Sequence, residues 1–328
     1  MSARSDSSKP VGRIAIIDIA RGTALLAMAI YHFAWDLEFF GYASPGMTAD
    51  VGWRLFARLI AGSFLFLVGF SLVLAHGRGI RWRPFAKRLA MVCAAALAIT
   101  VVTRFATPDR FIFFGILHCI AVSSVVGLVF LHLPATVTGL SGIAVIVVAP
   151  HLAAPFFDHP ALLWLGLATG PVQSNDYVPL FPWFGPVLLG MAAAQFAGGT
   201  GVLARLAALR PGSGILPSGL DFAGRHSLAV YLIHQPVLVA AISLFSLIAP
   251  PEQVDPAALF LSSCNRSCVQ TNEAGFCDHF CACTLRRLTE ETLLDAMMSE
   301  GTEALSKPEI QAVIQGCTAD FFTLPPSE

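Results

Sequence analysis

Four ionisable side chains interrupt the first strongly apolar stretch of the chain. This stretch, IAIIDIARGTALLAMAIYHFAWDLEFF (residues 14–40), contains Asp18, Arg21, His32 and Asp36. On an α-helix, which turns by about 100° per residue, the four side chains fall within an arc of about 80°. A charged side chain at the bilayer centre costs about 2.5 kcal/mol or more, so this face must point into a helix bundle or a water-filled cavity. The pattern therefore predicts a membrane helix with one polar face.

The spacing within this polar face suits acid–base chemistry. His32 and Asp36 are four residues apart, so the carboxylate can accept a hydrogen bond from one ring nitrogen and leave the other nitrogen as a general base. Asp18 and Arg21 are three residues apart and can form an ion pair. The alternative is that both pairs only hold neighbouring helices together. For Asp18 and Arg21 this alternative stays open; for His32 and Asp36 we favour chemistry, because Ser or Asn holds membrane helices together at lower cost.

The composition places these residues in a membrane protein. The chain has 328 residues, of which 55% are hydrophobic and only 12% are charged, whereas soluble domains carry about 25% charged residues. Spanning a bilayer takes about 20 apolar residues in a helix. The runs that meet this requirement lie at 14–36, 52–75, 88–106, 111–132, 135–154, 179–197 and 226–248. We expect an all-α integral membrane protein with a bundle of about seven transmembrane helices, or eight if the short apolar spacer at 156–170 also spans, plus a small cysteine-rich polar tail.

The distribution of Lys and Arg among the loops predicts the orientation of the chain in the membrane. The loop HGRGIRWRPFAKR (76–88) is rich in Lys and Arg, and short loops of this kind stay in the cytoplasm. The N-terminus and loop 198–225 then lie in the cytoplasm, while loops 37–51 and 155–178, which lack Lys and Arg, lie outside. We expect a multi-pass protein of the cell (inner) membrane. Its cytoplasmic N-terminal segment, transmembrane domain and extracytoplasmic tail are predicted at residues 1–12, 13–248 and 249–328.

The tail differs from the rest of the chain in charge and in cysteine content. Residues 249–328 hold 12 acidic and 4 basic side chains, whereas the other 248 residues hold 9 acidic and 16 basic ones. Six of the eight cysteines lie in the tail: Cys264, Cys268, Cys277, Cys281, Cys283 and Cys317. An even number of cysteines outside the cytoplasm predicts disulfides, which we favour over a metal or cluster site that includes His279. Residues 288–315 are typical of two short amphipathic helices with a break at Lys307-Pro308.

Five motifs carry a resemblance to a known family. They are RGTALLAMAIYHF (21–33), GSFLFLVGFSL (62–72), FGILHCIAV (114–122), DYVPLFPWFGPVLLG (176–190) and GRHSLAVYLIHQPVL (224–238). Together, over about residues 13–245, they resemble the catalytic domain of the heparan-alpha-glucosaminide N-acetyltransferase family in its short bacterial form. They are distantly similar to the membrane sugar O-acyltransferases. The resemblance implies transfer of an acetyl or other acyl group from cytoplasmic acyl-CoA to an amine or hydroxyl of a sugar on the far side of the membrane.

The resemblance also implies ligands and a role for His32. Acetyl-CoA would be a co-substrate rather than a permanently bound cofactor, and a sugar or glycolipid would be the acceptor. Besides these we expect membrane lipid, no nucleic acid and no bound metal, and homo-oligomer formation stays open. In the lysosomal branch the catalytic histidine lies in the loop after the first helix, but residues 37–52 here contain no histidine. The sugar O-acyltransferases resemble this chain in placing the histidine at the position of His32, as general base or acyl carrier.

Two further histidines lie inside predicted helices. His118 belongs to the third motif, and His234 precedes Gln235-Pro236, where a proline kink can frame a cavity. We include both with His32 and Asp36 as candidate catalytic residues. The alternative for each is a hydrogen-bonded interior histidine.

Basic residues near the cytoplasmic face are the candidates for binding acyl-CoA. Arg83, Lys87 and Arg88 begin the third helix from the inside, and Arg21 lies at the inner end of the first. Their positive charge suits the phosphates of CoA. The alternative is that the basic loop only sets the topology.

The acceptor candidates lie near the outer ends of the helices. Asp176, Tyr177 and Trp183 combine a carboxylate with aromatic rings, which suits sugar hydroxyls and ring faces, although Trp183 also fits an interfacial aromatic belt. Arg54 and Arg58 are four residues apart near the outer end of the second helix. They suit an anionic acceptor or an ion pair with a nearby acid.

Two other classes of protein compete with an enzyme. Buried Asp, Arg and His also mark transporters and channels, but we find no inverted repeat and no paired broken helices. The third class is a non-catalytic membrane anchor that presents the tail to a partner.

Overall fold

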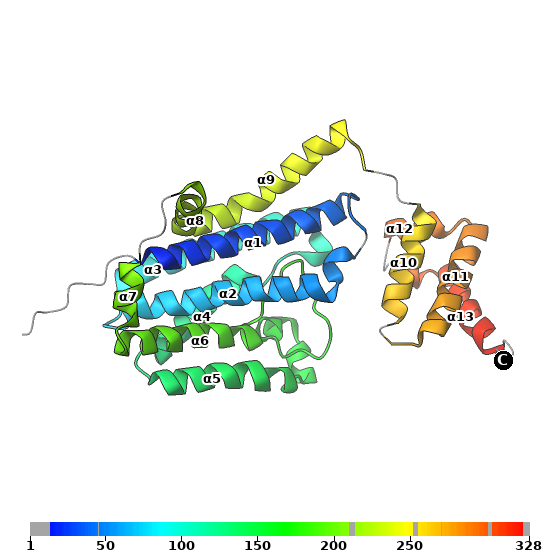
Figure 1. Ribbon diagram of the computed structural model, residues 1–328. Coiled ribbons are helices and arrows are strands. Elements are labelled where there is room, and N and C mark those ends of the chain that lie inside the picture. The colour runs from blue at the N-terminus through cyan, green and yellow to red at the C-terminus, as the bar shows by residue number, and fades with distance from the viewer. Residues whose placement is uncertain are drawn as a thin grey trace, which may run out of the picture. The chain divides into compact units, whose positions relative to one another are not determined.

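The computed structural model describes residues 14–44, 46–209, 214–251, 255–269, 271–300 and 304–323. The predicted N-terminal segment, 1–12, lies outside these residues. The chain divides into two compact units, Met1–Tyr31 with Arg54–Val237 and His32–Trp53 with Leu238–Glu328. Every regular element in the described ranges is helical, which confirms the predicted all-α class (Figure 1).

Five described helices are long and apolar enough to cross a membrane. They are α1 (Ala15–Phe39), α2 (Val51–His76), α3 (Trp82–Ala106), α6 (Leu180–Gly199) and α9 (Ser227–Ile248). Two shorter apolar helices, each extended by a 3-10 turn, are α4 (Ile116–Gly127) and α5 (Ala135–Val148). These seven helices match the seven runs that the sequence predicts.

The fourth helix begins later than the sequence predicts. The apolar run starts at residue 111, but α4 starts at Ile116, because the preceding residues pair with the loop ahead of α6. The backbone N–H of Asn175 donates to the Arg110 oxygen (2.9 Å), and that of Val178 donates to the Phe114 oxygen (3.1 Å). This pairing satisfies backbone groups that would otherwise need a helix.

The spacer between α5 and α6 contains no membrane-spanning helix among the described residues. It forms two 3-10 helices, η5 (Pro155–Asp158) and η6 (Pro160–Leu165). Helices of 4 and 6 residues are far shorter than the roughly 20 residues that a span needs. The option of an eighth span at 156–170 is therefore wrong.

The packed core of the first unit centres on α2 and α6, which lie side by side in Figure 1. Leu65 of α2 and Met191 of α6 are fully buried. The two backbones approach so closely that a Cβ on Gly69 would lie 1.9 Å from the Val187 oxygen, and one on Gly190 would also meet backbone. Only glycine fits at this crossing.

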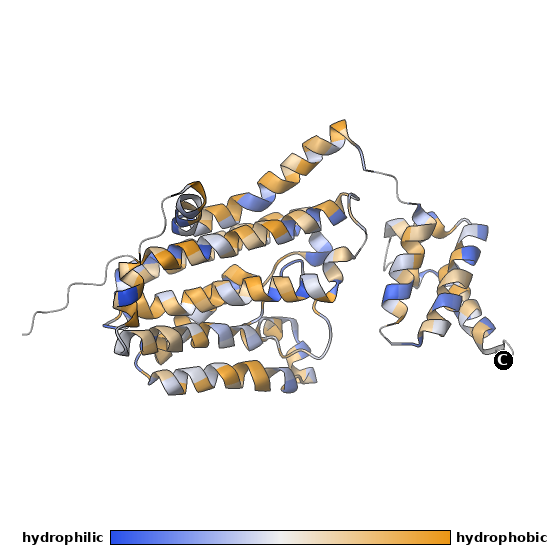
Figure 2. Ribbon diagram, viewed as in Figure 1, coloured by the Kyte–Doolittle hydropathy of each residue, from blue (hydrophilic) through white to orange (hydrophobic). Residues whose placement is uncertain are grey.

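The outward surface of several helices is strongly apolar. Figure 2 shows hydrophobic residues along much of α2 and α5, with more hydrophilic residues on α11 and α12. Large apolar side chains that are exposed on α3, α5 and α9 include Leu97, Val102, Phe105, Leu140, Val147, Leu247 and Ile248. Such a surface suits contact with lipid hydrocarbon.

Two short helices, which were not expected from the sequence, occupy the predicted cytoplasmic loop 198–225. They are α7 (Val202–Ala208) and α8 (Ile215–Arg225). On α8 the apolar side chains of Ile215, Leu216 and Phe222 are exposed. An exposed apolar face on a helix that also carries charged residues suits a position at the membrane interface.

The tail forms a small helical domain stapled by disulfides. Its helices are α10 (Pro256–Cys268), α11 (Ala274–Glu290), α12 (Leu294–Glu300) and α13 (Pro308–Thr323). The disulfides are Cys264–Cys281, Cys268–Cys277 and Cys283–Cys317. They confirm the prediction that the six cysteines form disulfides, and no group of residues within the described ranges could hold a metal ion. The helices α12 and α13 confirm the two predicted amphipathic helices.

Candidate active site

Helix α1 keeps its ionisable side chains away from its exposed surface. Asp18 is 2% exposed and Asp36 is 0% exposed, while Arg21 and His32 are half-buried. The exposed large apolar side chains of this helix are Ile16, Leu26, Ile30, Phe33 and, at its last residue, Phe39. The helix therefore has the polar inner face and apolar outer face that its sequence indicates. His32 and Asp36 lie four residues apart on the portion of α1 that belongs to the second unit.

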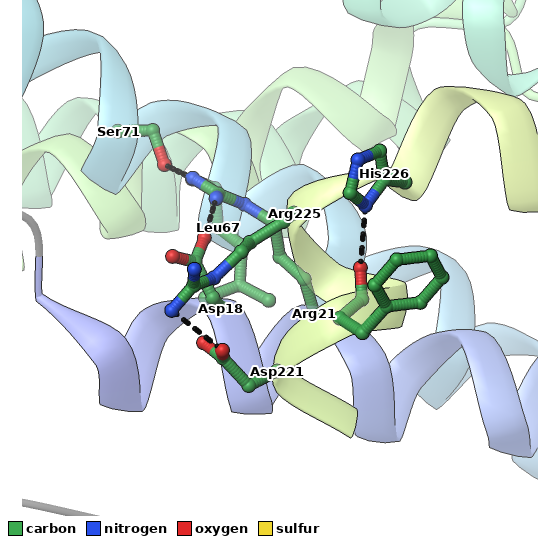
Figure 3. Close-up of polar contacts among 8 residues, drawn as sticks. Asp18, Arg21, Leu67, Ser71, Asp221, Arg225 and His226 are labelled. Atoms are coloured by element: carbon green, nitrogen blue, oxygen red, sulfur yellow. Dashed lines mark hydrogen bonds and ion pairs between the residues drawn. The ribbon is translucent and has the colours of Figure 1, made fainter. Parts of the chain in front are cut away.

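The Arg21 guanidinium is held between α1 and α2. Its Nη1 donates to Asp18 Oδ1 (2.7 Å), and its Nη2 donates to Ser71 Oγ (2.5 Å). The Ser71 hydroxyl in turn donates to the Leu67 backbone oxygen (2.5 Å). Figure 3 shows this chain of contacts. A buried carboxylate that is paired in this way fixes the arginine in one orientation.

Helix α8 packs directly on α1 at this cluster. A Cβ on Gly224 would lie 1.7 Å from the Asp18 backbone oxygen, and one on Gly22 would lie 2.0 Å from the Leu220 oxygen. The next residue, Arg225, pairs with Asp221 one turn earlier on α8 (2.6 Å). Figure 3 shows that the side chains of Arg225 and Arg21 both point toward the Asp18 region. The fifth sequence motif therefore supplies a close helix contact and a second arginine.

A substitution at Gly224 tests this packing. We expect Gly224→Ala to destabilise the protein by about 1–3 kcal/mol or more, because the new methyl group meets the α1 backbone, which cannot move aside. The free energy of unfolding is measured by denaturation of the detergent-solubilised protein. Gly219→Ala on the same helix is the matched control, since nothing lies within 4 Å of a Cβ there. Equal stability of the two variants would contradict the close contact.

The candidate acyl-CoA cations lie at the start of α3. Arg83, Lys87 and Arg88 are exposed. Arg88 also lines a small cavity of about 20 Å³, together with His76, Phe85 and residues of α2 and α4. A cavity of this size holds about one water molecule. The positive charges are thus available at the surface, and the cavity itself does not accommodate CoA.

His118 has both ring nitrogens engaged. Its Nδ1 accepts the backbone N–H of Gly115 (3.2 Å), so the ring proton of the neutral form lies on Nε2, 3.2 Å from Thr100 Oγ1. The Thr100 hydroxyl donates onward to the Ile112 backbone oxygen (2.7 Å). These contacts fix the start of α4 and leave neither nitrogen with an unused lone pair.

His234 has a different arrangement. Its Nδ1 lies 2.6 Å from the backbone oxygen of Tyr231, so Nδ1 carries the proton and the lone pair of the neutral ring lies on Nε2. Pro236 lies two residues later inside α9. The tautomer of His234 therefore differs from that of His118.

Asp176 and Tyr177 are engaged in building the loops ahead of α4 and α6. Asp176 Oδ2 accepts the backbone N–H of Ile116 (3.0 Å), which caps the start of α4. Burial raises the pKa of the Asp176 carboxyl, and the Ile116 hydrogen bond opposes that shift. The Tyr177 hydroxyl donates to the Leu163 backbone oxygen (2.6 Å), and burial raises the pKa of this phenol.

Two substitutions at Asp176 distinguish the effect of its charge on stability from the effect of the hydrogen bond with which it caps α4. We expect Asp176→Ala to lose about 1 kcal/mol of unfolding free energy, because the Ile116 N–H loses its acceptor. We expect Asp176→Asn to be at least as stable as the wild type at pH 7.5, because it keeps an acceptor and removes a half-buried charge. Since the folded-state pKa is raised, the wild type gains stability as the pH falls toward the ordinary carboxyl value, so the advantage of Asn should vanish near pH 4. Thermal unfolding midpoints at both pH values check this; an Asn variant as unstable as Ala would contradict the account.

The remaining acceptor candidates lie on α2 and α6. Arg54 and Arg58 are exposed on the first turns of α2, and Trp183 is half-buried against the core of the first unit. Glu38, one of the acids near these arginines in the sequence, accepts the backbone N–H and hydroxyl of Thr48 (2.9 and 2.7 Å).

Sequence reasoning missed a cavity in the loops that flank η6. Its volume is about 600 Å³. Its walls come from the segment before α4 and from η5, η6 and the loop that follows, and they include Phe111, Phe113, Asp158, Leu163, Thr169 and Gln173. The sequence does show an acid and several apolar residues in the 156–170 spacer. Periodicity alone, however, cannot show that this spacer lies beside the segment before α4.

Comparison with known proteins identifies a family for most of this chain. A family model described as "Heparan-alpha-glucosaminide N-acetyltransferase, catalytic" matches residues 13–236. No curated protein and no solved structure matches the chain. The family match includes all the candidate residues and ends within α9, before the tail.

Proposed function

The chain belongs to the heparan-alpha-glucosaminide N-acetyltransferase catalytic family, and we propose that it transfers an acetyl group from cytoplasmic acetyl-CoA to an amine or hydroxyl of a sugar on the opposite side of the membrane. The helices place it in a membrane, and the family is one of acetyltransferases. What we propose is the identity of the donor, the class of the acceptor and the roles of the catalytic residues.

The observation that carries the proposal is the polar face of α1 within the family match. Asp18 and Asp36 are almost completely buried on a predominantly apolar helix of a membrane protein. Ionisable groups within a membrane are costly and are kept where they act on a substrate or an ion. In a family of acetyltransferases, such a face suits the passage in which donor and acceptor meet.

His32 is the proposed base. The acceptor amine or hydroxyl attacks the thioester carbon and its proton passes to His32. The carbon–sulfur bond then breaks, and CoA leaves as a thiolate that takes up this proton. Asp36 orients the ring and stabilises its charged form. In the acyl-carrier version the ring nitrogen attacks the thioester carbon first, the carbon–sulfur bond breaks and CoA leaves as a thiol that takes the ring proton. The acceptor then attacks the acetyl carbon, the carbon–nitrogen bond to the ring breaks, and the acceptor's proton passes to the ring.

The donor is proposed to bind at the cytoplasmic ends of α1 and α3. Arg83, Lys87 and Arg88 are exposed and suit the CoA phosphates, which cations recognise by charge and hydrogen bonding. Arg21 is fixed by Asp18 and Ser71, so it can present its charge without reorganisation. A preorganised cation of this kind stabilises developing negative charge.

The two other histidines receive different proposed roles. His118 positions the start of α4, because both of its nitrogens are engaged. His234 carries its ring proton on Nδ1 in the neutral form and is the second candidate for proton transfer. On the acceptor side, Asp176 and Tyr177 also support the loops. The candidates for direct contact with the acceptor remain Asp176, Tyr177, Trp183, Arg54 and Arg58.

The proposed orientation places the N-terminus in the cytoplasm and the tail outside it, in the cell (inner) membrane. The basic loop 76–88 favours this orientation. The three disulfides of the tail support it independently, because disulfides persist in oxidising compartments and are rare in the cytosol.

Release of CoA tests the proposed reaction. The purified protein in nanodiscs receives acetyl-CoA with a mixture of amino sugars and neutral sugars. We expect free CoA in proportion to an acetylated sugar, whose mass and fragmentation separate N- from O-transfer. Absence of both CoA release and product with every acceptor, together with solute flux in liposomes, would favour a transporter instead.

A further inference from the structure

We propose that the cavity lined by Phe111, Phe113, Asp158, Leu163, Thr169 and Gln173 is a subsite for a sugar unit that carries a protonated amine. This inference rests on the proposed function and extends it to a second sugar unit of the acceptor. An amine held as ammonium by a carboxylate has no lone pair with which to attack a thioester. The unit bound here is therefore a neighbour of the one that is acetylated.

The cavity has the size and lining of a ligand site. Its volume of about 600 Å³ lies within the range of roughly 300–1,000 Å³ that is typical of small-molecule sites. Phe111, Phe113 and Leu163 supply apolar wall, and Gln173 supplies an amide. Aromatic faces and a few polar groups suit the C–H faces and hydroxyls of a pyranose ring. The Arg104 guanidinium stacks over Phe111 (5.6 Å to the ring centroid) and helps to hold that ring in place.

Asp158 gives the cavity its preference for a cation. Its Oδ1 accepts the backbone N–H of Thr169 (2.7 Å), and its Oδ2 accepts the Thr169 hydroxyl (2.6 Å). These bonds use two of about four acceptor positions on the carboxylate. The structure records no ion pair to Asp158 within the part of the chain that it describes. The cavity thus holds an oriented negative charge that an ammonium group can neutralise.

The cavity walls are held in place by hydrogen bonds between distant segments. The segment before α4 pairs with the loop ahead of α6 through Asn175 and Val178. Tyr177 links that loop to η6 through Leu163, and its ring packs on Phe113 (5.9 Å between centroids). A wall that is ordered before binding avoids the entropy cost of ordering it on binding.

Calorimetric titration of the full-length protein in nanodiscs, without acetyl-CoA, tests the subsite. The probes are the β-1,4-linked disaccharide of glucosamine, with both amines free and protonated, and its di-N-acetylated form. We expect Asp158→Asn to weaken binding of the free amine by about tenfold or more, because a charge-assisted hydrogen bond is lost. The acetylated probe should bind the wild type and this variant equally. Asp109→Asn, at another exposed acid that does not line the cavity, is the matched control and should bind like the wild type.

A second variant tests the location. Ala168 lines the cavity, and Ala168→Trp should fill it and weaken both probes. Unchanged binding of the free amine to Asp158→Asn or to Ala168→Trp overturns the subsite, as does absence of binding to the wild type. The titration contains no acetyl-CoA, so it tests binding separately from acetyl transfer. If the protein binds the free amine through Asp158 but releases no CoA in the activity assay, the subsite is supported and the proposed function is rejected.

Discussion

Replacing His32 with alanine should reduce the rate of acetyl transfer by about 10²- to 10⁴-fold, which is the usual contribution of a general base. The fold should persist, because His32 is only half-buried on α1. Acetylated sugar is quantified for wild type and variant at equal protein, and thermal unfolding verifies that both are folded. His132→Ala, at an exposed histidine after α4, is the matched control and should keep full activity.

The same variant separates the two versions of the reaction. If His32 carries the acetyl group, wild type incubated with labelled acetyl-CoA and no sugar should retain label on the His32 peptide, and the alanine variant should not. If His32 is only a base, neither protein should retain label. A folded His32→Ala variant with full activity would contradict both versions and move the search to His234.

Reducing the three disulfides should unfold the tail and leave acetyl transfer intact. The buried core of the tail is small: Phe260, Leu288, Ala304, Ile310 and Val313. Loss of a native disulfide from a small domain costs about 2–5 kcal/mol of stability. The loss of all three therefore costs more free energy than burial of such a small core can offset. Activity should persist because the family match ends at residue 236.

Hydrogen exchange and activity, measured with and without reductant, check this prediction. Peptides from α10 to α13 should lose protection, while those from α2 and α6 should keep it. The reductant acts only on the tail among the described cysteines, because Cys93 and Cys119 are already free thiols. Loss of activity in parallel with loss of tail protection would show that the tail takes part in the reaction. Deletion of residues 255–328 provides the same test without a reductant.

The helices and the tail could be predicted because their signals are local. Apolar runs of about 20 residues indicate spans wherever they occur, and the polar face of α1 follows from the positions of Asp18, Arg21, His32 and Asp36 along one helix. The presence of disulfides could be predicted from an even number of cysteines and from the predicted compartment. Which cysteine pairs with which could not be predicted.

The parts that escaped prediction depend on contacts between distant segments. Helix α4 begins late because Phe114 and Val178 share a hydrogen bond, which the apolar run conceals. The hydrogen bond with which Asp176 caps α4 also escaped prediction, and the expected contact of Asp176 with a sugar stays a prediction. Helix α8 was missed because its pattern includes Pro217 and two glycines, yet Gly224 is what allows α8 to pack on α1.

The most direct test of the central claim is transfer between opposite sides of a membrane. Proteoliposomes receive labelled acetyl-CoA outside and glucosamine disaccharide trapped inside, and acetylated sugar is measured in the lumen after the outer solution is removed. We predict lumenal product from wild type and none from His32→Ala. Product that forms only when acetyl-CoA and sugar share one side would contradict transfer across the membrane.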